Sequence, residues 1–309
     1  MTLSHALNNI SRYQKRYGFS KGIRAFLHYG YVGIKKPWLK PNQQNILTVN
    51  GCKLEIIPGD PFGTSAELLM FKTHEPISTK LISKLLKKGM TCLDIGANIG
   101  YYVLLESKLV GEEGKIIAIE PSPKNFEYLQ KNIKLQNTKK IQAFNIAAGN
   151  KEGKIRFLVY ENASNSGMVI PDGEEQKWPG KVIEVPIIKV DSLLQEKNIT
   201  KIDFLRMDVE GYEFHIFEGM QETLNQHKPI IQIEVHKSIM GDETTKKWFK
   251  MLQKFGYEVK YYIPREIDTP MIGTINDVKS YSLEKLTSML DNKLLPSFFM
   301  LSLINKNSN

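Results

Sequence analysis

From residue 90 onward the chain alternates between short apolar runs and segments whose apolar residues recur at helical spacing. This alternation limits the fold more than any other feature, because it is typical of βαβ units that build a parallel sheet. We therefore predict an α/β, Rossmann-like fold with a seven-stranded, mostly parallel sheet and helices on both faces. The predicted strands are 91–95, 115–119, 141–146, 202–207, 230–235, 258–263 and 298–304.

The segments around these strands carry helix and turn signals. Ser122 followed by Pro123 is an N-cap pair that begins a helix, and Gly89 and Gly256 are glycines of the kind that end one. Two β-rich runs, 155–160 and 182–190, have no helix between them, so we predict an inserted hairpin there. A hairpin is predicted over 46–57, with its turn at Asn50-Gly51. Helices are predicted over 77–85 and over 101–110. A third helix has Phe214, Phe217 and Leu224 on one face, and a fourth has Trp248, Phe249, Leu252 and Phe255 on one face.

The net charge of +9 comes almost entirely from the N-terminus. Residues 1–50 hold eight Lys and Arg and no Asp or Glu, whereas the other residues hold 34 bases and 33 acids. We predict a basic helical extension over 1–45 and a single α/β domain over 46–309, with its motif core at 90–236. Apolar residues at helical spacing, among them Leu3, Leu7 and Ile10, suit docking to a membrane surface or a nucleic acid, and equally a helix packed on the body.

Composition excludes several classes of protein. Two cysteines, Cys52 and Cys92, are too few for a disulfide framework or a Cys-rich metal site. The apolar stretch 294–304 is about half of what a membrane-spanning helix needs, and no secretory apolar run stands at the N-terminus. We expect a cytoplasmic protein whose membrane contact, if any, is made by the basic arm.

The run LDIGANIG, residues 93–100, is a strand followed by a tight turn and a helix. Gly96 and Gly100 allow close backbone approach, Asn98 tolerates a left-handed backbone, and Asp94 puts a negative charge near the same space. Glu120, at the tip of the next strand, suits the hydroxyls of a ribose. Together they indicate a nucleoside-bearing cofactor. The turn G-x-N-x-G is not a pyrophosphate-binding G-x-G-x-x-G, and an acid beside it suits a sulfonium, so S-adenosylmethionine is favoured over NAD.

Acidic residues follow two further strands. Asp208 and Glu210 come after 202–207, and Glu234 and His236 come at the end of 230–235. Ligands bind at the carboxyl ends of such strands, so these four side chains are expected to converge on one site. The alternative is ordinary capping and turn chemistry, with His236 on the surface. The same four residues suit Mg²⁺ or Mn²⁺, but no tight ligand motif is present, and we expect no metal.

The segments LDIGANIGYY, IIAIEPSP, VPIIKVDSLL, DVEGYE and IIQIEVH, with THEP at 73–76, resemble in order and spacing the FkbM family of S-adenosylmethionine-dependent methyltransferases. The resemblance covers roughly residues 71–236. It implies a class I methyltransferase fold and O-methylation of a hydroxyl on a sugar or related natural product. It also implies roles for further residues: Asp94, Gly96, Asn98 and Gly100 at the methionine part of the cofactor, Glu120 at the ribose, Asn145 and Ala147 near the adenine, and Asp208, Glu210, Glu75 and Glu234 near the methyl group or the acceptor.

A sugar hydroxyl must lose its proton as it is methylated, so a general base is needed. Asp208 is the first candidate and His236 the second. Three other functions stay open: an RNA- or DNA-directed methyltransferase that uses the basic arm, a binding module that kept the fold without the chemistry, and an NAD-dependent dehydrogenase. Nucleic acid is the less favoured partner, because Cys92 lies inside a predicted strand. The loops 161–179 and 265–295 are predicted to cover the acceptor.

Overall fold

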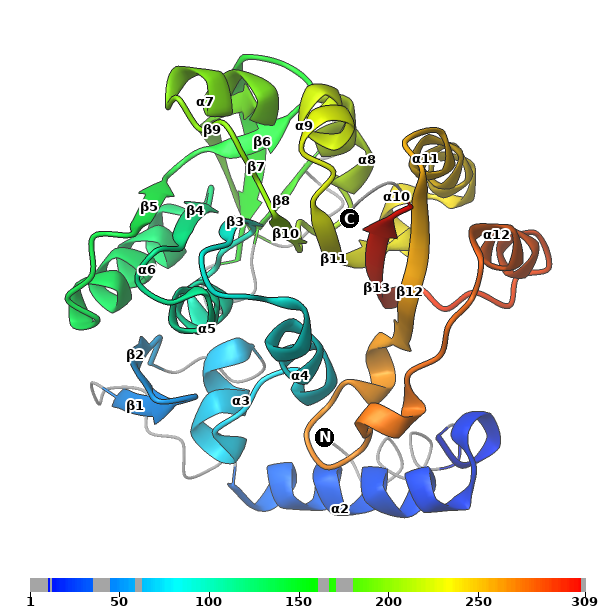
Figure 1. Ribbon diagram of the computed structural model, residues 1–309. Helices are drawn as coiled ribbons and strands as arrows, with labels where there is room; N and C mark the ends of the chain where they lie inside the picture. The colour runs from blue at the N-terminus through cyan, green and yellow to red at the C-terminus, as the bar shows by residue number, and fades with distance from the viewer. Residues whose placement is uncertain are drawn as a thin grey trace.

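A seven-stranded sheet forms the centre of the computed structural model, which describes residues 11, 13–35, 45–58, 63–160, 167–170 and 180–306 (Figure 1). The strand order is β12-β13-β11-β10-β3-β4-β5, and only β13 runs antiparallel to its neighbours. All seven predicted strands are present, which confirms the predicted fold class. Their bounds are β3 (Thr91–Ile95), β4 (Lys115–Ile119), β5 (Ile141–Phe144), β10 (Phe204–Met207), β11 (Ile230–His236), β12 (Tyr257–Pro264) and β13 (Phe298–Asn305).

The chain leaves β3 in one direction along the sheet and returns on its other side. It passes from β3 to β4 and β5, and later from β10 to β11, so the strand order reverses between β3 and β10. The loops that follow these two strands diverge at such a point and leave a crevice at their carboxyl ends. The topology therefore predicts a ligand site beside Gly96 and Asp208.

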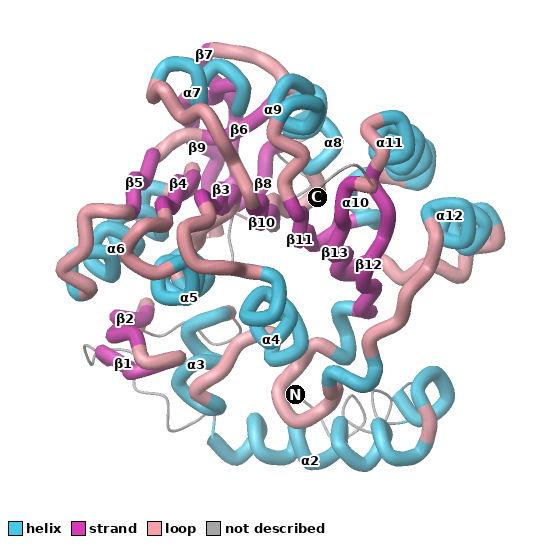
Figure 2. The backbone as a smooth tube through the Cα atoms, in the orientation of Figure 1, coloured by secondary structure: helices cyan, strands magenta, loops and turns pink. Residues whose placement is uncertain are grey.

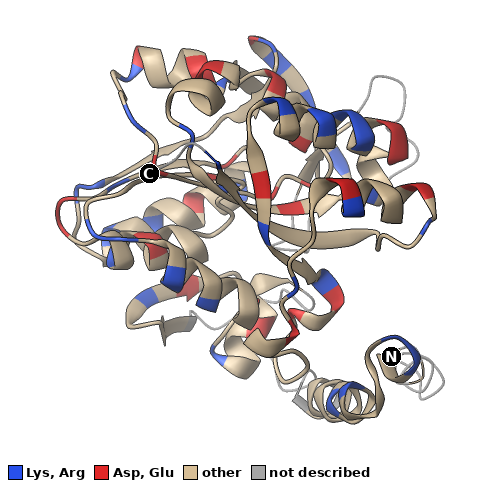
Figure 3. Ribbon diagram, turned by 45° about the vertical axis from the view of Figure 1, so that its right-hand side comes forward, with Lys and Arg blue, Asp and Glu red and all other residues tan. Residues whose placement is uncertain are grey.

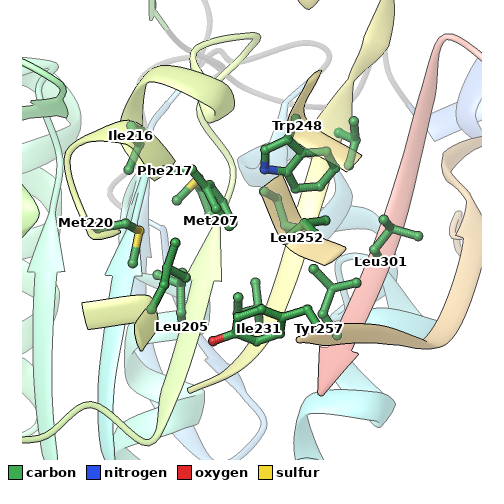
Figure 4. Packing of buried hydrophobic residues seen from close by; sticks show 14 of the residues in the cluster. Leu205, Met207, Ile216, Phe217, Met220, Ile231, Trp248, Leu252, Tyr257 and Leu301 are labelled. Carbon is green, nitrogen blue, oxygen red and sulfur yellow. The ribbon is translucent and has the colours of Figure 1, made fainter. Parts of the chain in front are cut away.

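Helices cover both faces of the sheet (Figure 2). One face packs its apolar side chains against the helices α4, α5 and α6, and the other against α7 to α9, α11 and α12. Figure 4 shows the second of these cores, where Trp248 meets Phe217 and Leu252 above Ile231. The helices are α3 (Thr64–Phe71), α4 (Pro76–Leu85), α5 (Tyr101–Val110), α6 (Pro123–Leu135), α7 (Val190–Glu196), α8 (Glu213–Glu218), α9 (Gln221–Gln226), α10 (Lys237–Met240), α11 (Asp242–Lys254) and α12 (Leu283–Asp291).

A second sheet of four strands interrupts the alternation, in the order β6-β9-β7-β8. Its strands are β6 (Ala147–Gly149), β7 (Gly153–Val159), β8 (Gly167–Val169) and β9 (Lys181–Lys189). The antiparallel pair β7 and β9 confirms the predicted inserted hairpin. Most of the predicted loop 161–179 lies outside the described residues.

The N-terminal part has a hairpin and a long helix. Strands β1 (Asn45–Val49) and β2 (Cys52–Ile56) pair antiparallel, and both Asn50 and Gly51 have positive φ, as the predicted turn requires. Helix α2 (Phe19–Lys35) lies along one edge of the molecule, below α3 and α4 in Figure 1. Leu3, Leu7 and Ile10 lie outside the described residues. In the described part of the chain no helix is both long and apolar enough to cross a membrane.

Three sequence predictions were wrong in detail. Helix α4 ends at Leu85, and Gly89 serves the turn before β3 instead, where its N–H donates to the carbonyl of Val110. The helix expected to carry Phe214 through Leu224 is broken into α8 and α9 at Gly219, where a side chain would meet the carbonyl of Gly149 at 1.8 Å. The stretch 265–295 is not a loop, because it contains two 3-10 turns, η3 (Arg265–Ile267) and η4 (Ile275–Asp277), and then α12.

Candidate active site

A pocket opens at the carboxyl ends of β3, β4, β10 and β11, where the reversal of strand order places it. One end of the pocket is mostly apolar and the other is crowded with charged side chains. The apolar end is lined by Ile119, Ala147, Ala148, Phe157, Val169 and Ile216, and the charged end by His74, Glu75, Asp208, Glu210, Glu234, His236 and Arg265.

The glycine turn after β3 contributes Gly96 and Asn98 to the lining of the pocket. Gly96 has φ +84°, and a Cβ at this position would meet the backbone oxygen of Asp208 at 1.9 Å. Only glycine therefore allows β3 and β10 to end this close together. Asn98 has the expected left-handed backbone, with φ 51°.

Glu120 binds the glycine turn directly. Its Oε2 accepts the N–H of Asn98 at 2.8 Å, and its Oε1 accepts the N–H of Ser122 at 2.9 Å. Burial raises the pKa of this carboxyl to about 7, although the two N–H donors oppose the shift. The carboxyl lies at the tip of β4 beside the apolar end of the pocket, as the sequence predicts for a group that binds a ribose.

A row of buried polar residues crosses the middle of the sheet beneath the pocket. Asp94, Arg206, Gln232 and Ser302 are neighbours in register on β3, β10, β11 and β13. Arg206 lies 4.1 Å from the ring centre of Tyr102 on α5, so the row is on the face that α4 and α5 cover. Charged residues inside a sheet are costly unless paired.

Arg206 connects this row to the site. Its Nη1 lies 3.3 Å from Asp94 Oδ1, and its Nη2 lies 3.1 Å from Asp208 Oδ2. Burial raises the pKa of Asp208 above its ordinary value, whereas Arg206 and His236 oppose the shift. The guanidinium therefore orients the Asp208 carboxylate towards the pocket and keeps it charged.

His236 faces carboxylates on both sides. Its Nδ1 lies 2.6 Å from Glu213 Oε1, and its Nε2 lies 3.2 Å from Glu210 Oε2 and 3.9 Å from Asp208 Oδ1. Burial alone would lower the pKa of the imidazole, but Glu210 and Glu213 outweigh it and hold the pKa well above its ordinary value. His236 is 3% exposed, so the alternative of a surface histidine is wrong.

The charged end also contains residues that the sequence analysis missed. Arg265, in η3, lies 3.0 Å from Glu75 Oε1 through Nη2 and 3.2 Å from Glu234 Oε1 through Nε. Burial would raise the pKa of Glu75, but Arg265 and then His74 hold it well below its ordinary value. Burial raises the pKa of Glu234 to about 8 in spite of Arg265.

A group suited to a divalent cation is present in the described part of the chain. Potential ligand atoms of Asp208, Glu234 and His236 all lie within 4.8 Å of one another. Each acid nevertheless has a protein cation beside it: Arg206 at Asp208, and Arg265 at Glu234. Glu210 and Glu213 also raise the pKa of the His236 imidazole, so a metal at this group would have to displace a proton from it.

Nine of the twelve site residues predicted from the sequence line the pocket, namely Glu75, Gly96, Asn98, Glu120, Ala147, Asp208, Glu210, Glu234 and His236. The other three lie behind it. Asp94 is fully buried and faces Arg206, so the expectation that its carboxylate points into the site is wrong. Gly100 is the N-cap of α5, and the Asn145 side chain donates to the carbonyls of Glu120 and Pro121.

Comparison with known proteins identifies the class to which this fold and pocket belong. Residues 94–259 match the family model of the methyltransferase FkbM domain. The match covers more than half of the chain and includes the ends of β3, β4, β10 and β11. The chain therefore belongs to the FkbM family of methyltransferases.

Individual relatives are distant. Methyltransferase 1 of Beauveria bassiana is 24% identical over 185 residues, which are 54% of this chain and 72% of the relative. The hexuronic acid methyltransferase AglP of Haloferax volcanii is 24% identical over 160 residues, 50% of this chain and 59% of the relative. The crystal structure of an FkbM methyltransferase from Methylobacillus flagellatus is 17% identical, covers 58% of this chain and 42% of its own, and has a TM-score of 0.42.

Proposed function

We propose that this protein transfers a methyl group from S-adenosylmethionine to a hydroxyl of a sugar, a glycan or a related natural product. The observation that carries the proposal is a partly buried aspartate, Asp208, held by Arg206 at the charged end of a pocket whose other end offers Glu120 and an apolar slot. Membership in a methyltransferase family supports the reaction. The name of the Haloferax volcanii relative supports a sugar as acceptor. In this proposal residues 46–309 form the methyltransferase domain.

The residues fit the cofactor in three places. The carboxylate of Glu120 is placed to accept a hydroxyl of the ribose, because it lines the pocket and its three donors, the N–H groups of Asn98 and Ser122 and the Asn125 side chain, leave it acceptor capacity. The apolar wall that includes Ala147 and Phe157 suits the flat face of an adenine. The carboxylates of the charged end suit a sulfonium cation. When bound, S-adenosylmethionine supplies a methyl group on a positively charged sulfur.

Asp208 is the proposed general base. As the bond between the acceptor oxygen and the methyl carbon forms and the carbon–sulfur bond breaks, its carboxylate takes the hydroxyl proton. Burial makes this carboxylate a stronger base than an exposed aspartate, and Arg206 holds it in one orientation. His236 serves less well as the base, because its imidazole already carries both protons between Glu210 and Glu213. We assign to His236 and Glu210 the positioning of Asp208, and to Glu75 and Glu234 the binding of the acceptor.

Two alternatives are weaker on the same observations. A nucleic-acid methyltransferase that attacks a pyrimidine needs an accessible cysteine thiolate, whereas Cys92 is fully buried and burial raises the pKa of its thiol. A binding module without chemistry has no need to keep a buried arginine, Arg206, paired with Asp208, because burying a guanidinium is costly.

Two measurements test the proposal. S-adenosylhomocysteine at 100 times its Kd is expected to raise the free energy of unfolding by about 2.7 kcal/mol, whereas NAD is expected to have no effect. Tritium from labelled S-adenosylmethionine is then expected to appear in a member of a panel of soluble sugars and glycans, including uronic acids. Stabilisation by NAD alone, or transfer to RNA and to no sugar, would overturn the proposal.

A further inference from the structure

Helix α2 packs a mixed side against the body, which includes two buried polar side chains, and turns an apolar side outward. The side that meets the body includes Lys21, Ala25 and His28, which are all buried. On the outer side Phe19 is 69% exposed, Phe26 56% and Ile34 69%. Among the residues that the structure describes, ten large apolar side chains are exposed, and five of them are on this one helix: Phe19, Ile23, Phe26, Leu27 and Ile34. We call these five the outer face of α2.

This orientation is held by specific contacts. The ammonium group of Lys21 pairs with Asp277 and also donates to the carbonyl of Ile272 at 3.3 Å. On the same side the ring of His28 stacks on Phe71 of α3, with 5.2 Å between ring centres. Rotating the helix to bury its outer face would expose these groups and break the buried pair. The outer face therefore stays available to a partner, because a contiguous apolar surface on one element marks an interaction site.

Charge indicates which partner the outer face fits. Residues 1–50 contain eight bases and no acid, and Figure 3 shows Lys and Arg but no Asp or Glu along α2. Exposed Lys15 precedes the helix and exposed Arg24 lies within it, whereas Arg16 pairs with Glu266 of the body. A second copy of this chain would bring two acid-free, basic segments together, which repel each other. A bilayer with anionic headgroups offers both an apolar interior and negative charge.

The residues just before the helix connect it to the wall of the pocket. Tyr13 donates to the backbone oxygen of Glu266 at 2.8 Å, and Tyr17 donates to its carboxylate at 3.1 Å. Glu266 is the neighbour of Arg265, which lines the charged end. The residues that lead into α2 thus contact the segment next to the site where the acceptor is proposed to bind.

We propose that the outer face of α2 docks the protein on an anionic phospholipid surface, with the helix lying in the headgroup region. Phe26 and Leu27 enter the interface, and the surrounding bases contact the headgroups. The docked orientation suits an acceptor sugar that is linked to a lipid, and this part of the inference rests on the proposed methyltransferase function.

The test is sedimentation of the full chain with phosphatidylcholine vesicles that contain or lack phosphatidylglycerol. We expect sedimentation only with the anionic vesicles, and weaker binding as salt is raised. The double variant Phe26→Ser, Leu27→Ser is expected to lose about tenfold or more in partitioning, because it removes two apolar side chains from the interface. Leu294→Ser is the matched control: Leu294 is 65% exposed but lies on the segment after α12, and its loss is expected to change nothing.

The outcomes separate docking from catalysis. The double variant is expected to keep its melting temperature and its methyl transfer to a soluble acceptor, since neither residue lies in the pocket. Absence of binding to anionic vesicles, or equal binding by the double variant, would overturn the docking proposal and leave the methyltransferase proposal intact. A dimer that the double variant dissociates, or a shift of RNA without vesicle binding, would also overturn it.

Discussion

Replacing Gly96 by alanine tests whether the glycine turn sets the spacing between β3 and Asp208. Gly96 has φ +84°, and left-handed backbone costs a residue with a Cβ about 1–2 kcal/mol. The new Cβ would also lie 1.9 Å from the oxygen of Asp208, far inside the 3.4 Å at which ordinary contact begins. Overpacking of this kind lowers the free energy of unfolding by about a further 1–3 kcal/mol. We expect Gly96→Ala to lower the free energy of unfolding by about 2–5 kcal/mol in total.

Gly89→Ala is the matched control for this substitution. Gly89 has nearly the same φ, +80°, but a Cβ there would meet nothing within 4 Å. It should therefore show only the backbone cost of about 1–2 kcal/mol and keep full affinity for S-adenosylhomocysteine. Urea unfolding and titration calorimetry measure the two effects, and Gly96→Ala is expected to lose at least about tenfold in affinity. Equal stability of the two variants, with equal affinity, would refute the close approach of β3 and β10 as the reason for the glycine.

The other predictions concern single groups in the pocket. Asp208→Asn is expected to keep S-adenosylhomocysteine binding by calorimetry but to lose about 10²–10⁴-fold in turnover, and unchanged turnover would remove Asp208 from the role of base. Because the pKa of Glu120 is raised to about 7, its carboxyl is mostly protonated at pH 6 and mostly charged at pH 8, so affinity for the cofactor should rise about tenfold over that interval. Glu120→Gln should bind weakly with no such rise, and a parallel rise in the variant would assign it to another group. Activity is expected to survive exhaustive treatment with EDTA, since Arg206 and Arg265 already lie against Asp208 and Glu234, and loss that Mg²⁺ or Mn²⁺ restores would show a metal site instead.

The strands and the end of the pocket that contains Glu120 were predictable because their signals are local. A buried strand followed by a glycine turn has the same sequence pattern in any fold. The acid at the tip of the next strand is expected near this turn because the carboxyl ends of parallel strands lie at one edge of the sheet. Gly96, Asn98 and Glu120 were all placed at the pocket by this reasoning, and the structure has them there.

The charged end was only partly predictable, because its contacts join distant parts of the chain. Nothing local to Arg265 indicates that it pairs with Glu75, because the two residues lie far apart in the chain and are brought together only by the tertiary fold. Arg206 did carry a signal, a base inside an otherwise apolar strand, and its burial explains why Asp94 faces inward. The sequence indicated a basic amphipathic segment within residues 1–45, but the pattern alone does not tell which side of a helix meets the body.

The most direct test of the account is a crystal structure of the protein with S-adenosylhomocysteine. We predict that the ligand fills the pocket at the ends of β3 and β4, with its ribose hydroxyls on the Glu120 carboxylate, its adenine beside Ala147, and its sulfur on the side of Asp208. A ligand bound elsewhere, or a pocket that stays empty at saturating ligand, would contradict the proposed cofactor site.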